Sequence, residues 1–346
     1  MNHDHYMSRC FDLARLGAGR VSPNPMVGAV LVHQGRIIGE GWHMKYGEAH
    51  AEVNALKNVF PEDRHLIEKS TLYVSLEPCC IHGKTPPCTN LILENKIKKV
   101  VISCIDQTPG VKGGGVAVLQ RAGVEVIHGV MEDKGKEISA FRNTFTAKKR
   151  PFVQLKFAQT KNGFMGQRGR QVWISNLFTK RLAHQLRSES DAILIGKNTA
   201  LADGPKLTNR LWFGHSPLRI VLDKNLDIPA GNPVFGEGAR TWVVTEKTPP
   251  AGLPPNCIFQ KIKFDENLLP NLLAKLFENK VTSLIVEGGA YTLQQFVGQG
   301  LWDEALVFTG NKTLESGIAA PKIPGQIIKE WPVAGDLVSL YRRRPF

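Results

Sequence analysis

The chain has 346 residues, of which 42% are hydrophobic and 22% charged, and its formal net charge is +13 at pH 7. A length of about twice 150 residues predicts two domains, and the composition is typical of globular proteins, which excludes the disordered and fibrous classes. No apolar run reaches the roughly 18 residues of a membrane span, no signal peptide is recognisable, and the basic residues are spread along the chain, so we expect a cytoplasmic protein whose partners are anionic small molecules rather than membranes or nucleic acids.

The first half of the chain alternates helical and strand-like segments after an initial hairpin. A helix is predicted over residues 3–18, and the apolar runs Val27–Val32 and Arg36–Trp42 form a β-hairpin. The segments that follow are a helix at His50–Val59, a strand at Thr71–Leu76, a helix at Thr89–Asn95, a strand at Lys99–Cys104, a helix at Gly115–Ala122, a strand at Val124–His128 and one helix at 133–147. This alternation predicts an α/β sandwich with parallel strands after the hairpin.

A basic, proline-containing stretch, Lys148-Lys149-Arg150-Pro151, marks a domain boundary, so the predicted domains are residues 1–148 and 149–346. The second half again alternates. Its predicted elements are strands at Phe152–Phe157, Ala192–Ile195, Leu218–Leu222, Thr241–Thr245 and Leu284–Glu287, a helix at Leu177–Ser188 and a proline-rich loop at Pro249–Pro255. A second α/β domain is therefore expected.

The first chemical pattern combines a histidine, a glutamate and clustered cysteines. The triplet His50-Ala51-Glu52 is followed by Cys79 and Cys88, and clustered cysteines in a cytosolic chain indicate metal binding more than a disulfide scaffold. A catalytic zinc takes three protein ligands and keeps a fourth position for water, so one imidazole and two thiolates suffice. Glu52 can then move protons without ligating the metal, which is the arrangement of the zinc deaminases.

Several motifs around these residues occur together in one family: Pro23-Asn24-Pro25-Met26-Val27-Gly28, Gly39-Glu40-Gly41-Trp42-His43, His50-Ala51-Glu52-Val53-Asn54, Leu76-Glu77-Pro78-Cys79 and Gly83-Lys84-Thr85-Pro86-Pro87-Cys88. Over essentially its whole length, the chain resembles the bifunctional diaminohydroxyphosphoribosylaminopyrimidine deaminase / 5-amino-6-(5-phosphoribosylamino)uracil reductases of riboflavin biosynthesis. The resemblance implies one zinc ion per chain on His50, Cys79 and Cys88, with Glu52 as the catalytic proton carrier. It also implies a homo-oligomer and deaminase substrate contacts from Asn24, His43, Lys84 and Thr85.

The second half lacks a Rossmann fingerprint, but Ser283–Ala290 has the pattern of a strand, a Gly-Gly turn and a helix start. Backbone N–H groups at such a turn can bind an anion. Trp173-Ile174-Ser175 and Leu186-Arg187-Ser188 also occur in the family's reductase domain, which is similar to dihydrofolate reductase. The resemblance implies NADPH contacts from Ala158, Trp173, Thr199, Asp203, Gly289, Ala290, Tyr291, Thr292, Leu293, Gln294 and Gln295. It implies substrate contacts from Gln171, Arg187, Leu207, Arg210 and Glu287.

The implied fold is a cytidine-deaminase-like α/β/α sandwich followed by a dihydrofolate-reductase-like α/β domain. The implied function is hydrolytic deamination of 2,5-diamino-6-(5-phosphoribosylamino)pyrimidin-4(3H)-one. NADPH reduction of the ribosyl side chain then gives 5-amino-6-(5-phosphoribitylamino)uracil.

The chain departs from the family pattern in both halves. Cys80 and Ile81 stand where the family has Ser and His, with His82 one place later, so Cys80 or His82 could close the zinc site as a purely structural one. The departures in the reductase half are Lys161, Asn162, Gln171 and Gly204. The alternatives are an active deaminase whose reductase domain only binds ligand, a nucleic-acid deaminase, and a non-catalytic zinc module.

Overall fold

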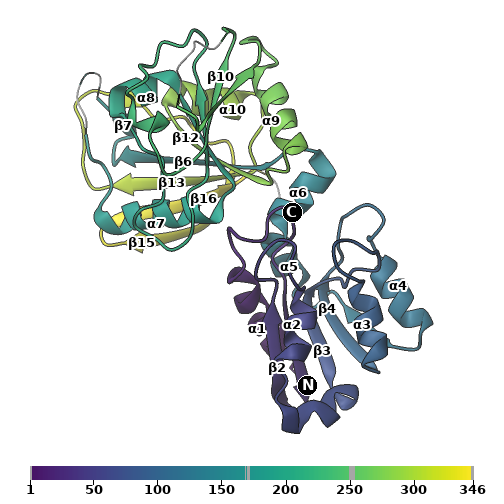
Figure 1. The fold of residues 1–346 in the computed structure, drawn as a ribbon. Helices are drawn as coiled ribbons and strands as arrows, with labels where there is room; N and C mark the ends of the chain where they lie inside the picture. Colours follow the sequence, from purple (N-terminus) through teal and green to yellow (C-terminus); the bar gives the residue numbers. More distant parts are fainter. Residues whose placement is uncertain (1, 168, 170–171, 249–253, 344–346) are drawn as a thin grey trace. The chain divides into compact units, whose positions relative to one another are not determined.

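The computed structural model describes residues 2–167, 169, 172–248 and 254–343. The chain divides between Arg150 and Pro151 into two compact units, each built around its own β-sheet (Figure 1). Among the described residues, no helix combines the length and the apolar character that crossing a membrane requires. The proline-rich loop predicted at Pro249–Pro255 lies mostly outside the described residues.

The strands of the first unit are β1 (Gly28–His33), β2 (Arg36–Trp42), β3 (Thr71–Leu76), β4 (Lys99–Cys104) and β5 (Glu125–His128). They form one sheet in the order β2-β1-β3-β4-β5. β1 is antiparallel to β2 and β3, whereas β3, β4 and β5 are parallel. The predicted hairpin and the parallel strands after it are confirmed.

The helices of this unit are α1 (His3–Arg15), α2 (Ala51–Lys57), α3 (Cys88–Glu94), α4 (Gly114–Arg121), α5 (Glu132–Ile138) and α6 (Ala140–Lys148), with a 3-10 helix η1 at Pro61–Lys69. One core contains apolar side chains of α2, α3 and α4, and a second core contains those of α1 and α5. Because helices cover both faces of the sheet, β1, β3 and β4 are buried along nearly their whole length rather than alternating. This is the predicted sandwich.

The single helix predicted at 133–147 is wrong, because the chain forms two helices there. α5 and α6 are separated by Ser139, which has φ −88° and ψ 6°. Ser139 is buried, and α5 packs so closely on β4 that a Cβ on Gly135 would lie 2.3 Å from Oγ of Ser103. We attribute the break to this packing, since tertiary contacts override helix propensity.

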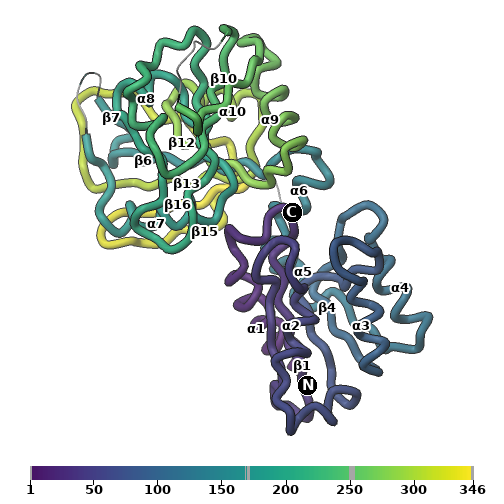
Figure 2. Tube along the Cα trace, in the orientation of Figure 1, coloured from purple at the N-terminus to yellow at the C-terminus, as the bar shows by residue number. Residues whose placement is uncertain are grey.

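The strands of the second unit are β6 (Phe152–Thr160), β7 (Phe164–Gly166), β8 (Ala192–Gly196), β9 (Leu218–Leu222), β10 (Thr241–Thr245), β11 (Cys257–Lys261), β12 (Ser283–Gly288), β13 (Glu304–Gly310), β14 (Ile318–Ala319), β15 (Gln326–Val333) and β16 (Asp336–Arg342). Nine of them form a sheet in the order β11-β10-β9-β8-β12-β6-β13-β16-β15, parallel from β11 to β13 and antiparallel beyond. Figure 2 shows β6 and β13 side by side, although they lie far apart in the sequence. The five predicted strands are confirmed.

The helices of the second unit are α7 (Leu177–Glu189), α8 (Lys197–Asp203), α9 (Leu268–Glu278) and α10 (Ala290–Gly298), with a 3-10 helix η2 at Pro233–Phe235. α8 follows β8 directly, and α10 follows β12 after Gly289. Both helices therefore begin at the carboxyl end of the parallel strands, which is where open α/β sheets bind ligands.

Candidate functional site

Three metal-ligating side chains converge in the first unit. His50 is the N-cap of α2, Cys79 follows β3, and Cys88 is the first residue of α3. The Nδ1 atom of His50 lies 3.3 Å from Sγ of Cys88 and 3.6 Å from Sγ of Cys79, and all three ligand atoms lie within 4.8 Å of one another. No other cluster of this kind occurs in the described ranges. One nitrogen and two sulfurs fit the donor set of a catalytic zinc site.

Neither of the two candidate fourth ligands completes this cluster. The Cys80 thiol lies 3.9 Å from the carbonyl oxygen of Gly110, and Nδ1 of the exposed His82 lies 3.2 Å from the carbonyl oxygen of Gly83. Both are absent from the group of convergent ligands. A zinc ion held by three protein ligands keeps a position for water, which distinguishes a catalytic site from a structural one.

The surroundings of Cys79 and Cys88 favour the thiolate form of Cys79 only. The hydrogen bond from Cys88 lowers the pKa of the Cys79 thiol to about 4, against the opposing effect of burial. The backbone N–H of Cys88 also donates to Sγ of Cys79 at 3.3 Å. The same pairing with Cys79, together with burial, raises the pKa of the Cys88 thiol. A bound metal would supply the charge that removes this second proton.

Glu52 lies beside the cluster without belonging to it. It is in the first turn of α2, and its side chain is 3% exposed. Burial raises the pKa of its carboxyl group, and the nearby charge of His50 lowers it by less. A carboxyl group whose pKa is shifted toward neutral pH can both accept and return a proton during a reaction.

Asn24 and His43, predicted to contact the substrate, are connected to each other and to the cluster. Nδ1 of His43 lies 3.0 Å from the carbonyl oxygen of Ala49, and Nε2 lies 3.1 Å from Nδ2 of Asn24. Because a carbonyl oxygen only accepts, His43 carries its proton on Nδ1, and its Nε2 accepts from Asn24. Burial lowers the pKa of His43, which favours this neutral form. Its ring meets that of His50 edge-on at 5.4 Å.

Lys84 and Thr85, the other two predicted contacts, lie on the loop that joins the two cysteine ligands. Oγ1 of Thr85 is 3.5 Å from Nε2 of His50. Nζ of the exposed Lys84 lies 4.2 Å from the centre of the Tyr46 ring, in a cation–π contact. The loop therefore places a hydroxyl group at the metal cluster and a cation near its rim.

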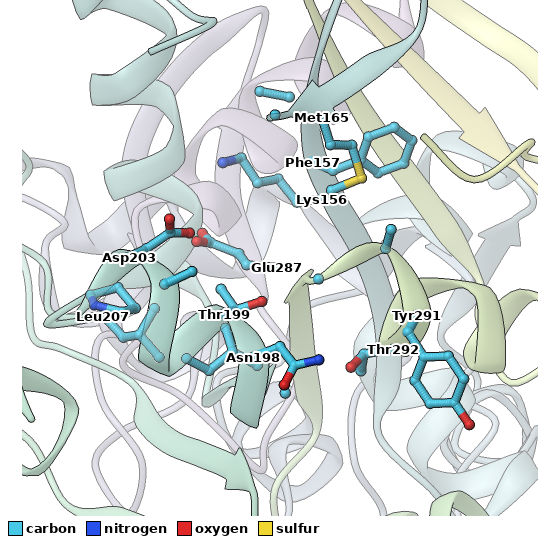
Figure 3. Close-up of a pocket in the computed structure, with 18 of the residues that line it drawn as sticks. Lys156, Phe157, Met165, Asn198, Thr199, Asp203, Leu207, Glu287, Tyr291 and Thr292 are labelled. Atoms are coloured by element: carbon cyan, nitrogen blue, oxygen red, sulfur yellow. The ribbon is translucent and has the colours of Figure 1, made fainter. Parts of the chain in front are cut away.

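A cavity of 1420 Å³ lies at the carboxyl ends of the strands in the second unit (Figure 3). Nine residues predicted to contact NADPH line it: Ala158, Trp173, Thr199, Asp203, Gly289, Ala290, Tyr291, Thr292 and Gln295. Leu293 and Gln294, the other two residues of that prediction, are not among the residues that line the cavity, since Leu293 is buried in the core and Gln294 is exposed. Neighbouring positions on a helix point in different directions, so the side chains of a run of seven residues cannot all face one ligand.

The predicted substrate residues of the reductase lie on the same cavity. Those that line it are Arg187, Leu207, Arg210 and Glu287. Gln171 lies outside the described residues. The cavity thus brings both predicted residue sets, from distant parts of the sequence, to one place.

Two glycines let the backbone approach closely at this cavity. A Cβ on Gly196 would lie 2.6 Å from Oγ1 of Thr292, and a Cβ on Gly289 would lie 3.0 Å from Oγ1 of Thr199. Gly289 is the N-cap of α10 and is joined to Gly288 by a cis peptide bond. The N–H groups at the start of α10 have no partners within the helix and can bind a phosphate, so these residues fit a dinucleotide cofactor.

A carboxylate and two cations meet in the cavity. Arg187 donates through Nε to Oε1 of Glu287 at 3.1 Å and through Nη2 to Oε2 at 2.7 Å. Burial alone would raise the pKa of Glu287, but the charges of Arg187 and Lys156 outweigh it and lower the pKa to about 2. Burial lowers the pKa of Lys156. Sequence reasoning missed Lys156, although it is the one charged residue in the apolar run Phe152–Phe157.

His184 on α7 is neutral beside these charges. Its Nδ1 accepts from the backbone N–H of Arg210 at 3.0 Å, and burial together with the charges of Arg187 and Arg210 lowers its pKa from 6.5 to about 4. Between pH 6.5 and about 4 the unfolded chain binds a proton that the folded chain does not. The contribution of neutral His184 to the free energy of unfolding is therefore fully present above pH 6.5 and is lost as the pH falls toward 4.

We therefore expect the second unit of a His184→Gln variant to lose less free energy of unfolding than the wild type on going from about pH 7 to about pH 5. Urea denaturation at a series of pH values measures this. The exposed His215→Gln is the matched control and should behave as the wild type. Equal pH dependence of His184→Gln and wild type would contradict the expectation.

Three of the departures from the family pattern, Lys161, Asn162 and Gly204, lie in the described residues and leave the cavity intact. Asn162 accepts from Oγ1 of Thr160 at 2.9 Å and from the N–H of Leu314 at 3.2 Å, and it donates to the carbonyl oxygen of Leu314 at 2.7 Å. Asn162 therefore connects the turn after Thr160 to the segment at Leu314 by hydrogen bonds. Lys161 is not among the residues that line the cavity. Gly204 ends α8 with φ 48° and removes a carboxylate, but the adjacent Asp203 remains on the cavity wall.

Comparison with known families matches both units. Residues 1–104 match the cytidine and deoxycytidylate deaminase zinc-binding region, and residues 151–327 match the RibD C-terminal domain. The chain is 38% identical over 330 residues to riboflavin biosynthesis protein RibD of Aquifex aeolicus, covering 94% of this chain and 92% of that protein. It is 37% identical over 328 residues to the RibD protein of Bacillus amyloliquefaciens, covering 92% and 87%.

Solved structures agree with these matches. A diaminohydroxyphosphoribosylaminopyrimidine deaminase/5-amino-6-(5-phosphoribosylamino)uracil reductase from Thermotoga maritima superposes with a TM-score of 0.91 at 35% identity, covering 99% of both chains. A RibD structure from Acinetobacter baumannii superposes with a TM-score of 0.86 at 26% identity, again covering 99% of both chains. The fold class predicted for the two halves is confirmed.

Proposed function

The chain belongs to the RibD family of riboflavin biosynthesis proteins, and from this premise we propose the substrates, domain limits and site residues of its two reactions. It is a bifunctional enzyme that joins a zinc-dependent deaminase to an NADPH-dependent reductase. Residues 1–148 form the deaminase domain and residues 149–346 the reductase domain. The first domain deaminates 2,5-diamino-6-(5-phosphoribosylamino)pyrimidin-4(3H)-one, and the second reduces the product to 5-amino-6-(5-phosphoribitylamino)uracil.

The deaminase assignment rests on the convergence of His50, Cys79 and Cys88 beside a buried Glu52. Zinc held by the three ligands supplies a Lewis acid that makes water a nucleophile near neutral pH. Glu52 takes the two protons of the attacking water one after the other, passing the first to the ring nitrogen and the second to the leaving amine. The 2-amino group then leaves as ammonia, and the ring carbon keeps the oxygen of water as a carbonyl.

Asn24 and His43 orient the pyrimidine over this centre. Since Nδ2 of Asn24 is held by His43, the amide oxygen of Asn24 is the atom left to accept from the substrate. Thr85 lies against His50, and Lys84 supplies a point charge for the ribose phosphate.

The reductase assignment rests on the cavity and its charges. NADPH, held by the lining residues already named and by Gly289 at the start of α10, supplies the hydride that reduces the ribosyl C1′. Lys156 and Glu287 project into the cavity in Figure 3. Lys156 supplies the proton that opening of the ribose ring consumes, and the Glu287 carboxylate raises the pKa of this amine against burial, which lowers it.

Arg187 and Arg210 bind the substrate phosphate. Nη1 of Arg187 lies 3.4 Å and Nη1 of Arg210 lies 3.3 Å from the carbonyl oxygen of Thr208, so the two guanidinium groups approach each other. Two neighbouring positive charges attract an anion more strongly than one does. Planar guanidinium groups also match the geometry of phosphate oxygens.

A coupled assay with the diaminopyrimidine phosphate, zinc and NADPH tests both activities. We expect ammonia release followed by oxidation of one NADPH per ammonia. Absence of zinc-dependent ammonia release would overturn the deaminase assignment. Ammonia release with NADPH binding but no oxidation would support the alternative in which the reductase domain only binds ligand.

Removal of zinc should separate the two activities. With only three protein ligands, the metal can be withdrawn by a chelator, and ammonia release should then fall to background. NADPH oxidation with the deaminated substrate should persist, because no described residue of the reductase cavity belongs to a metal cluster. Metal analysis and both assays before and after adding back zinc measure this. Loss of both activities on chelation would contradict it.

The chain works in the cytoplasm as a homo-oligomer. None of the six cysteines is in a disulfide, which suits a reducing compartment. The edge strand β15 exposes Ile327 and Ile328, 45% and 39% accessible, which is apolar surface that a second copy could cover. Light scattering after size-exclusion chromatography measures the mass of the particle, and a monomer at all concentrations would refute the assembly.

A further inference from the structure

Arg219 in β9 is a fully buried cation, with 0% of the residue exposed. Burial lowers its pKa, and the nearby Cys257 opposes that effect only in part. Its Nε atom is buried without a hydrogen-bond partner. An uncompensated buried charge is costly to keep, so the groups that it does bind require an explanation.

The hydrogen bonds of Arg219 join two separate loops. Nη2 donates to the carbonyl oxygens of Gly236 and Ala239, both at 2.6 Å, and Nη1 donates to the carbonyl oxygen of Lys206 at 3.2 Å. The Gly236–Ala239 turn is also held from a second side, because Nδ2 of Asn256 donates to the same two carbonyl oxygens, each at 3.1 Å. The turn is thus a fixed anchor, and Lys206 is attached to it through Arg219.

Lys206 belongs to the segment 203–210, which forms one wall of the reductase cavity. The lining residues of this segment are Asp203, Gly204, Pro205, Lys206, Leu207 and Arg210. Leu207 is buried and has φ +54°, a left-handed conformation that a leucine adopts only when its surroundings impose it. The bond from Arg219 to the preceding carbonyl is one such constraint. One residue further on, Thr208 offers the carbonyl oxygen at which Arg187 and Arg210 meet.

We propose that Arg219 is a positioning residue for the reductase substrate: by fixing the Lys206 carbonyl it holds the segment 203–210 so that Arg210 meets Arg187 in the geometry that binds the ribose phosphate. This inference rests on the proposed reductase function. Arg219 is not among the residues that line the cavity, so its side chain acts from outside the ligand site. An apolar side chain could fill its space in the core but could not bind three carbonyl oxygens.

The test compares Arg219→Met and Arg219→Lys with the wild type in the full-length enzyme. The deaminated substrate is supplied with and without its phosphate. We expect Arg219→Met to raise the KM of the phosphorylated substrate roughly 10-fold and to reduce the preference for it over the dephosphorylated form by a similar factor, because the two-arginine clamp is misaligned. The kcat should stay within about twofold of wild type, and the Kd of NADPH should rise much less than the KM, because Asp203 is the one proposed NADPH contact in segment 203–210 and lies farther along the chain from Lys206 than Leu207 does. Arg219→Lys, which keeps the charge but can bond fewer carbonyls, should fall between the two.

Arg240→Lys is the matched control, since Arg240 is exposed and next to the same turn, and it should leave every parameter unchanged. An unchanged KM in Arg219→Met would overturn the inference. So would a KM change accompanied by an equal loss of NADPH binding and thermal stability, because this would show general damage to the domain. A wild-type enzyme with no reductase activity would instead refute the proposed function itself.

Discussion

Replacing Glu52 with glutamine should lower the rate of ammonia release by roughly 10²- to 10⁴-fold, the range typical of a lost general acid–base group, while zinc stays bound. Glutamine has nearly the same shape but cannot accept and return a proton. The three ligands His50, Cys79 and Cys88 are untouched, and Glu52 does not belong to that cluster. Ammonia release and zinc content per chain, measured on the same preparation, give the two required numbers.

The exposed Glu48, two residues before His50, provides the control, and Glu48→Gln should retain wild-type ammonia release. NADPH oxidation with the deaminated substrate should be the same in both variants, because the reductase cavity is built in the other unit. If Glu52→Gln kept more than about a tenth of the wild-type rate, Glu52 would not be the proton carrier.

Replacing Glu287 with glutamine should lower reductase kcat/KM by at least about 10²-fold and leave ammonia release unchanged. The wild-type carboxylate is ionised throughout the neutral range, since its pKa is about 2. Glutamine leaves Arg187 and Lys156 together in the cavity without a negative charge between them. The pKa of Lys156, already lowered by burial, should fall further, so the amine holds the proton that the reduction needs less firmly.

The same change should destabilise the second unit, because removing one partner of a buried ion pair costs about 3–5 kcal/mol. The Arg187 and Glu287 side chains are only 12% and 10% exposed, so solvent screens them little. Kinetics with NADPH and thermal denaturation measure the two effects. Glu278→Gln, at an exposed position at the end of α9, is the control. Unchanged reductase kinetics in Glu287→Gln would show that Glu287 has no role in the reduction.

The candidate metal centre could be predicted because its ligand residues lie in short, recognisable sequence motifs. His50, Cys79 and Cys88 each stand at the junction of a predicted strand or helix and a loop, and few combinations of residue types suit zinc. The pattern could not decide whether Cys80 or His82 closed the site. Only the folded loop answers this, since it turns the Cys80 thiol toward Gly110 and leaves His82 exposed.

The reductase cavity was less accessible to sequence reasoning, because its parts come from distant segments. Arg187 and Glu287 are 100 residues apart in the chain, and their ion pair exists only because α7 and β12 pack in one domain. Lys156 lies in an apolar strand, where nothing local indicates which cavity it will face. The side chains of Leu293 and Gln294 lie off the cavity lining, because a helix presents only one face to a ligand and a continuous run of residues cannot follow that face.

By itself, the sequence determined the two α/β domains, most of their central strands and the three residues that converge as candidate metal ligands, because periodicity and ligand chemistry act over a few residues. Packing decided the break at Ser139, the placement of Cys80 and His82 away from the three candidate metal ligands, the charges around Glu287 and the hydrogen bonds of Arg219 to segment 203–210 and the Gly236–Ala239 turn. These features depend on which distant groups share a buried, poorly screened space, and burial and distance set the strength of their interactions.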